Sequence, residues 1–184
     1  MTQVFIAYGT TEGHTATISE FVADVLRGRG HGVTVADVNE MDAVPDEYGA
    51  IIVGDSVHVG KHDKSVIDFA ARNLGALGSH PSAFLSVSLG VVGDEQEARK
   101  YVREFEAASG WHPEHVSLVA GALLYTQYSF VKRQLMRTIA ASKAGVLSTD
   151  TSVDHIYTDW DQLRRFAEDF ADQLASTPAR PNPA

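Results

Sequence analysis

The chain has 184 residues, of which 44% are hydrophobic and 21% charged, and its formal net charge at pH 7 is −9. These values are typical of one globular domain with a sizeable core, and the acidic balance argues against a nucleic-acid-binding protein, which needs a basic surface. Because cysteine is absent, disulfides, thiolate nucleophiles, iron–sulfur clusters and cysteine-ligated zinc are excluded. Any redox chemistry must therefore use an organic cofactor.

The sequence also bears on location and on metal binding. The first residues include neither the basic nor the long apolar segment of a secretory signal, and apolar stretches such as 118–124 are too short to span a bilayer. We therefore expect a cytoplasmic protein. The eight histidines show neither an H-E-x-x-H pattern nor another recognisable ligand spacing, so we expect no bound metal. The oligomeric state stays open.

Apolar runs and helical periodicities alternate along the chain. Strands are predicted at 4–7, 33–38, 50–54, 82–89 and 116–122, and helices at 15–29, 64–74, 95–109 and 159–174. Strands that alternate with helices over short connections predict an α/β fold with a doubly wound parallel sheet. We expect five strands, one domain over 1–175 with an insertion at 125–158, and a flexible tail at 176–184.

The first strand ends in a turn rich in hydroxyl groups and glycine, and an amphipathic helix follows. Free backbone N–H groups at a helix N-terminus attract anions, and threonine hydroxyls add further donors. The turn has neither the lysine of a nucleoside triphosphatase loop nor a G-x-G-x-x-G pattern, so it suits one monoester phosphate. An ordinary connection capped by threonine is the alternative. The candidate residues are Thr10, Thr11, Glu12, Gly13, His14 and Thr15.

This turn resembles the phosphate loop of flavodoxins, which reads T-x-T-G-x-T in outline. Thr10, Gly13 and Thr15 match the outline, whereas Glu12 stands where the second threonine would be. The resemblance implies a flavodoxin-like sheet with the strand order 2-1-3-4-5 and FMN as the cofactor, bound where the strand order reverses between the first and third strands. The missing hydroxyl must then be replaced by Thr11 or by backbone donors.

Two further loops are expected to form the walls around the flavin ring. After the third strand, backbone groups and a histidine can meet the ring, although a solvated loop histidine is the alternative; the candidates are Ser56, Val57, His58, Val59 and Gly60. After the fourth strand, a glycine-rich loop can bond the ring edge through its main chain; the candidates are Ser88, Leu89, Gly90, Val91, Val92 and Gly93. This loop lacks the aromatic residue with which many flavodoxins cover the ring, so we expect one ring face to be open to a second substrate; an ordinary glycine-rich turn, with the cover supplied from elsewhere, is the alternative. We also expect Asp55 and Asp94 beside the ring.

The C-terminal half is similar to a narrower family. The segments PSAFLSVSL at 81–89, SGWHP at 109–113, VAGALLY at 119–125 and YTDW at 157–160 resemble the menaquinone-dependent protoporphyrinogen dehydrogenases. This resemblance runs from residue 3 to about residue 172. It implies an FMN-dependent oxidoreductase of haem biosynthesis, with a porphyrinogen as substrate and a quinone as acceptor. Since the flavin carries such chemistry, no catalytic residue is assigned.

The insertion is the cationic part of an acidic chain. Residues 124–149 include no acidic residue but four basic ones, and the spacing of their apolar residues predicts an amphipathic helix. Three interpretations remain: substrate binding, peripheral contact of 125–149 with the inner face of a membrane, and a helix packed on its own sheet. The candidate substrate-binding residues are Tyr125, Arg133 and Arg137.

Two other functions compete with the enzyme. One is an electron carrier that cycles between protein partners, and the other is a partner-binding module that has lost its flavin. The hydroxyl-rich phosphate loop argues against the second. The insertion and the absent aromatic cover favour the enzyme over the carrier.

Overall fold

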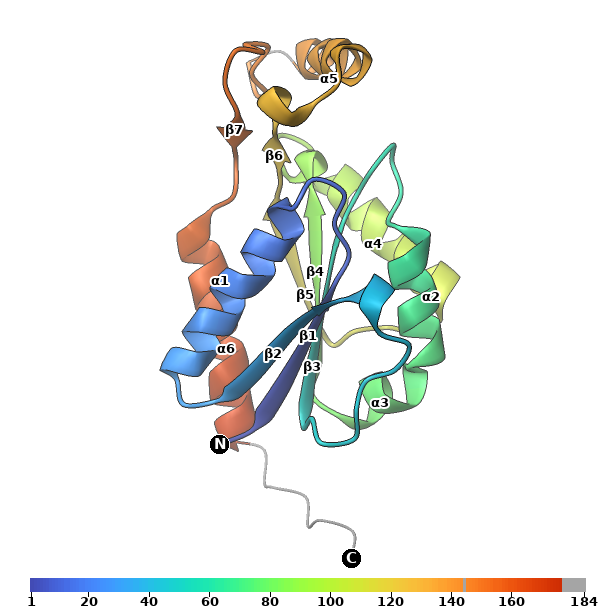
Figure 1. Cartoon of the computed structure of the whole chain (residues 1–184), viewed down its shortest axis with the longest axis vertical. Coiled ribbons are helices and arrows are strands. Elements are labelled where there is room, and N and C mark those ends of the chain that lie inside the picture. The colour runs from blue at the N-terminus through green and yellow to red at the C-terminus, as the bar shows by residue number, and fades with distance from the viewer. Residues whose placement is uncertain (144, 177–184) are drawn as a thin grey trace, which may run out of the picture.

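The computed structural model describes residues 1–143 and 145–176, and its centre is a five-stranded parallel sheet (Figure 1). The strand order is β2-β1-β3-β4-β5, which confirms the predicted α/β fold and topology. The inner strands are continuous apolar runs because helices cover both faces of the sheet. The strands are β1 (Gln3–Tyr8), β2 (Gly32–Asp37), β3 (Ala50–Ser56), β4 (Ser82–Ser88) and β5 (His115–Ala120).

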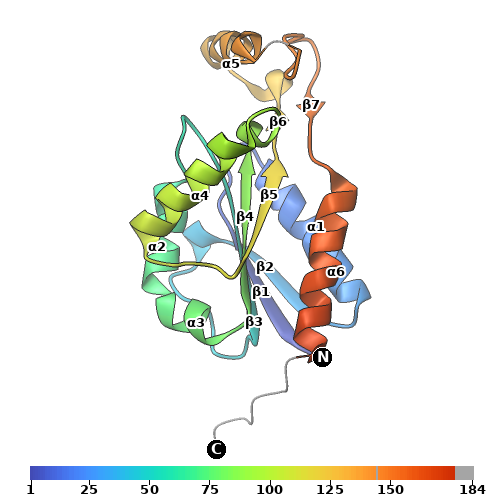
Figure 2. The same ribbon diagram turned by 180° about the vertical axis from the view of Figure 1, so that it is seen from behind.

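The helices form a layer on each side of the sheet (Figure 2). One layer holds α1 (His14–Gly28) and α6 (Trp160–Ser176), and the other holds α2 (Lys64–Arg72), α3 (Leu74–Ser79) and α4 (Glu95–Ser109). Since side chains alternate along a strand, Val4 and Ile6 of β1 enter the first core, and Phe5 and Ala7 enter the second. In the second core, the rings of Phe84 and Phe105 stack with centroids 4.2 Å apart.

Most element boundaries differ from the sequence prediction by one or two residues, and two of the differences have a clear structural cause. The helix expected at 64–74 ends at Arg72, because the side-chain amide of Asn73 donates to the Phe69 carbonyl and its oxygen accepts from the Val44 N–H, and α3 follows. The fifth strand ends at Ala120, after which β6 (Ala122–Leu123) pairs antiparallel with β7 (His155–Ile156).

The insertion lies between β6 and β7, beyond the carboxyl edge of the sheet (Figures 1 and 2). It contains α5 (Phe130–Ser142) and has a small core of its own, formed by Leu123, Leu124, Tyr125, Tyr128, Ala140 and Leu147. The short 3-10 turns η1 (Val38–Glu40), η2 (Leu89–Val91) and η3 (Tyr125–Gln127) complete the fold. In residues 1–143 and 145–176, no helix is both long and apolar enough to cross a membrane. Apart from Ser176, which ends α6, the expected tail lies outside the described residues.

Candidate flavin site

A cleft opens at the carboxyl edge of the sheet, between the loops that follow β1, β3 and β4 and the insertion. Such an edge is where ligands bind in open α/β sheets. Segments distant in sequence meet here, since the lining is formed by Thr10, Glu12, His14, Thr15, Ser56, Val57, His58, Val87, Ser88, Leu89, Gly121, Ala122, Leu124, Tyr128, Lys132 and Met136.

The loop after β1 has the geometry of an anion site. Gly13 has a φ of 84°, a left-handed conformation that glycine adopts freely, and it caps the N-terminus of α1. The Thr10 hydroxyl accepts from the Gly13 N–H at 2.9 Å and shapes the turn. The Thr15 hydroxyl is 1% exposed and finds no hydrogen-bond partner in the part of the chain that the structure describes. A buried hydroxyl without a partner costs free energy, so this atom suits a bound phosphate oxygen.

His14 ties this loop to the end of the insertion. Its Nε2 atom lies 2.8 Å from the Thr158 hydroxyl, which itself donates to the Ala120 carbonyl at 2.7 Å. Because that hydroxyl has one hydrogen, His14 must donate from Nε2. Burial lowers the pKa of His14, which keeps the ring neutral at physiological pH.

The loop after β3 makes a strained hairpin turn. His58 and Lys61 exchange backbone hydrogen bonds, and Val59 and Gly60 between them have φ values of 49° and 75°. Val59 is the one non-glycine residue with positive φ in residues 1–143 and 145–176, and it is 99% exposed. A β-branched residue is strained in this conformation. The His58 Nε2 atom lies 3.0 Å from the Ser56 hydroxyl, at the wall of the cleft.

The insertion supplies the fourth wall. Tyr128, Lys132 and Met136 line the cleft from α5 and the turn before it. Lys132 forms an ion pair with Glu12 of the phosphate loop, and its ammonium group lies 4.9 Å from the centroid of the Tyr128 ring. Burial raises the pKa of Tyr128 to about 12, so its phenol stays protonated.

Comparison with known proteins is consistent with this geometry. Residues 5–150 match the family model of the flavodoxin domain. The chain is 35% identical over 181 residues to a quinone-dependent protoporphyrinogen IX dehydrogenase of Leishmania major, covering 95% of this chain and 77% of that protein. It is 30% identical over 173 residues to the enzyme of the same name in Escherichia coli K12, covering 92% and 94%.

The chain belongs to the flavodoxin-domain protoporphyrinogen IX dehydrogenase family. This family membership confirms the resemblance found in the sequence, and the relatives are oxidoreductases. Among solved structures, a short-chain flavodoxin associated with a bacterial microcompartment superposes with a TM-score of 0.57 at 16% identity, covering 96% of this chain and 100% of that chain. At that identity, the likeness supports the fold alone.

Within this dehydrogenase-family fold, the cofactor residues expected from sequence divide into two groups. Thr10, Glu12, His14 and Thr15 line the cleft from the first loop, and Ser56, Val57, His58, Ser88 and Leu89 from the other two. The Ser88 hydroxyl, 4% exposed, also has no partner among the described residues. Thr11, Gly13, Val59 and Gly60 are exposed outside the lining, and on the β4 loop the described lining stops before Gly90, Val91, Val92 and Gly93.

The candidate substrate residues are placed differently from the expectation. Tyr125 is fully buried and donates to the Ser148 carbonyl, and Arg133 donates to the carbonyls of Tyr125 and Tyr128 at 3.0 and 3.2 Å. These contacts hold the insertion together. Arg137 is exposed on α5. The lining residues missed from the sequence are Val87, Gly121, Ala122, Leu124, Tyr128, Lys132 and Met136. For Lys132 and Met136 of α5 the spacing of four was a usable signal, because residues four apart share a helix face.

The two acidic residues expected beside the ring lie elsewhere. Asp94 caps α4 by accepting from the Glu97 N–H at 3.0 Å. Asp55 points into the second core, toward α2, where its Oδ2 atom lies 3.0 Å from His62 Nδ1 and accepts from the Asp63 N–H at 2.8 Å. Neither carboxylate belongs to the described cleft lining.

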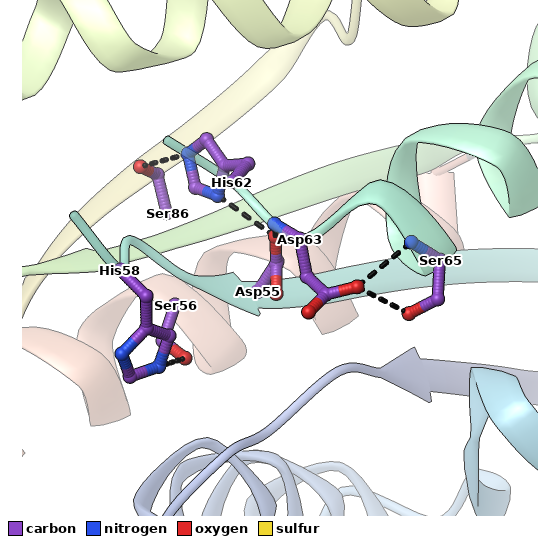
Figure 3. A network of polar contacts seen from close by, with 7 residues as sticks. All are labelled: Asp55, Ser56, His58, His62, Asp63, Ser65 and Ser86. Carbon is purple, nitrogen blue, oxygen red and sulfur yellow. Dashed lines mark hydrogen bonds and ion pairs between the residues drawn. The ribbon is translucent and has the colours of Figure 1, made fainter. Parts of the chain in front are cut away.

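The Asp55 contact is part of a buried polar network that the sequence analysis missed. Figure 3 shows Asp55 and His62 directed toward one another with Ser86 beyond the ring, while Ser56 and His58 form a separate pair. His62 Nε2 lies 3.1 Å from the Ser86 hydroxyl. The order of groups is that of a serine hydrolase triad, but Ser86 is fully buried, so no substrate reaches it. Burial raises the pKa of Asp55, and the bond to His62 opposes that rise.

Metal binding has no structural support within residues 1–143 and 145–176. There, no group of three or more histidine, aspartate or glutamate side chains is arranged to hold a metal ion.

Proposed function

We propose that the cleft binds FMN and that the protein oxidises protoporphyrinogen IX, with a quinone as electron acceptor. The observation that carries the cofactor assignment is the buried Thr15 hydroxyl without a described partner, at the N-terminus of a glycine-capped helix. The donors here are neutral and suited to one phosphate. The substrate assignment rests on the names of the relatives, which this chain matches over nearly its whole length.

Different parts of the chain contact the phosphate and the ring of such a cofactor. The first N–H groups of α1 and the hydroxyls of Thr10 and Thr15 hold the phosphate, and the loops after β3 and β4 flank the ring. The Ser88 hydroxyl, buried and without a partner in the described residues, is an available hydrogen-bonding group on that wall. When bound, FMN supplies the electron transfer, and the protein supplies position, exclusion of water and electrostatics.

The exposed face of α5 suits contact with a lipid surface, where hydrophobic quinones reside. Val131 is 76% exposed, Leu135 55% and Ile139 39%, and because they are spaced four residues apart they form one apolar stripe on the helix. Phe130, 74% exposed, and Arg137, seven residues later, lie on the helix side that borders this exposed face, so the surface combines apolar side chains with a cation. Within the proposed function, this surface places the cleft beside the source of the acceptor. Co-sedimentation with anionic vesicles, lost in Leu135→Asp, is the expected result.

Purified protein tests the proposal directly. It is expected to carry FMN or to bind added FMN, and to oxidise protoporphyrinogen IX anaerobically with menadione as acceptor. Thr10→Ala with Thr15→Ala removes two hydrogen bonds to a charged acceptor, each about 1.5–3 kcal/mol, and weakens FMN binding by about two orders of magnitude or more. Protein that takes up no FMN contradicts the cofactor assignment. Protein that binds FMN but never turns over protoporphyrinogen is instead an electron carrier.

A further inference from the structure

The phosphate loop and the insertion are joined by one ion pair inside the cleft. Lys132 lies in the first turn of α5, and its ammonium group contacts the carboxylate of Glu12, 120 residues earlier in the chain. The pair is partly buried, with side chains 37% and 19% exposed. It therefore lies at the junction between the phosphate site and the insertion.

The charge of Glu12 is unfavourable for the ligand that this loop suits. A carboxylate beside a phosphate dianion raises the energy of the bound state, most strongly where water is partly excluded. When His14 is neutral, Glu12 is the one charged residue in the loop at 10–15, which includes no lysine or arginine. Lys132 is the one lysine or arginine among the described residues that line the cleft. It is therefore the cation available to balance both anions.

The backbone of Lys132 is held in place, whereas its side chain is flexible. The Ser129 hydroxyl caps α5 by accepting from the Lys132 N–H at 3.4 Å, which places the backbone. The ammonium group of Lys132 lies over the ring of Tyr128, a residue that is 6% exposed. A lysine side chain has a flexible stem of four carbons, so its ammonium group can move from a carboxylate to a phosphate while the helix stays in place.

A second observation in the same cleft points to a ligand. The Thr15 hydroxyl is 1% exposed and has no hydrogen-bond partner in the described residues. Thr15 belongs to α1 and Lys132 to α5, and both line the same cleft. A phosphate that satisfies Thr15 is thus placed in a cleft that also contains a lysine head.

We infer that Lys132 binds the phosphate of the cofactor together with the loop at 10–15, and that Glu12 holds the ammonium group while no phosphate is bound. The inference rests on the proposed FMN function. It gives the insertion a role in cofactor binding, because the same cation joins α5 to the phosphate loop in one state and to the phosphate in the other. Glu12 competes with the phosphate for Lys132.

The experiment measures the affinity of apoprotein for FMN and for riboflavin, which lacks the phosphate, by quenching of flavin fluorescence at low salt. Lys132→Gln is expected to weaken FMN binding about 10–100-fold, as loss of a charged hydrogen bond does, and to change riboflavin affinity less than about 2-fold. Glu12→Gln is expected to tighten FMN binding. Lys143→Gln is the matched control, because Lys143 pairs the insertion with Glu97 on α4 at 2.5 Å, and it should leave both affinities unchanged.

Opposite signs for the two variants are the decisive result. If Lys132→Gln and Glu12→Gln weaken FMN binding alike, or if Lys132→Gln weakens riboflavin equally, the pair is only a structural link and the inference is wrong. Unchanged FMN affinity in Lys132→Gln also overturns it. If the wild-type protein binds riboflavin and FMN equally well, the cofactor phosphate contributes no affinity, and the inference about Lys132 is wrong although the cleft still binds a flavin. If the protein binds neither ligand, the proposed function is wrong as well. Inorganic phosphate should compete with FMN in the wild type and less in Lys132→Gln.

Discussion

The sheet domain and the insertion are built from similar amphipathic helices but differ in what covers them. In the sheet domain, α2 turns Val66, Phe69 and Ala70 onto the sheet, and all three are fully buried. In the insertion, α5 buries only Ala140 completely and leaves Leu135 and Val131 more than half exposed. Helical periodicity alone does not distinguish the two cases, because it indicates which residues share a face and not which partner covers that face.

Core truncation should give the largest contrast between the two regions. Phe84→Ala removes a fully buried ring that stacks on Phe105, so the free energy of unfolding should fall by about 3–5 kcal/mol. Leu135→Ala on α5 should change it by less than about 0.5 kcal/mol, as exposed substitutions do. Urea unfolding measures both. A cost above about 1 kcal/mol for Leu135→Ala would show that this face is covered in solution, and its dependence on protein concentration would then identify a second copy.

Polar pairs should show the same contrast with a smaller difference. His62→Phe keeps an aromatic ring at this position but leaves the buried Asp55 without its hydrogen-bond partner, which costs about 3 kcal/mol. Lys143→Gln breaks the partly exposed pair that joins the insertion to α4, at a cost of about 1 kcal/mol or less.

A second variant separates the loss of the Asp55–His62 pair from any packing defect. Asp55→Asn added to His62→Phe removes the uncompensated charge, so it should recover part of the lost stability. A double variant less stable than His62→Phe would instead assign the loss to packing against Phe84 and Phe105, whose ring centroids lie 5.2 and 5.4 Å from that of His62.

Sequence patterns were sufficient to locate the strands of the sheet and the turn between β1 and α1, because each depends on neighbours in the chain. The strand order followed instead from the resemblance to flavodoxins, and the sheet topology confirms it. Val4 to Ala7 is apolar because both faces are covered, and Thr10 to Thr15 lies directly between a strand and a helix. The network of Asp55, His62 and Ser86 depends on the pairing of β3 with β4, which sets their distances only after folding. For a similar reason the sequence did not reveal the bonds from Arg133 to the carbonyls of Tyr125 and Tyr128, which form only once the insertion is folded.

The buried pair of the sheet domain and the pair that joins α4 to the insertion should also differ in the sign of their response to pH. Burial raises the pKa of Asp55 above 3.8, so its contribution to stability is complete below that value and is lost as pH rises through the raised pKa. The bond from Lys143 is the main cause that lowers the pKa of Glu97 below 4.5, so its contribution is present above 4.5 and is lost on acidification.

Urea unfolding of Asp55→Asn and Glu97→Gln from pH 3 to 7 tests these signs. The stability of the wild type relative to Asp55→Asn should fall as pH rises, and its stability relative to Glu97→Gln should increase. The same slope in both comparisons would mean that the Asp55 carboxylate is stabilised, not destabilised, by its surroundings.

The smallest expected effect is a gain at the exposed turn of the flavin wall. Val59 has a φ of 49° and Gly60 a φ of 75°, which are the signs required by a type I′ hairpin turn, for which Asn-Gly is the favoured pair. Since Val59 is 99% exposed, replacing it loses no packing. Val59→Asn should therefore raise the free energy of unfolding by about 0.5–1 kcal/mol. Val153→Asn, at an exposed position outside the described positive-φ residues, should give no gain. If FMN binding weakens in Val59→Asn while stability rises, the strain at this turn is maintained for the cofactor rather than tolerated by the fold.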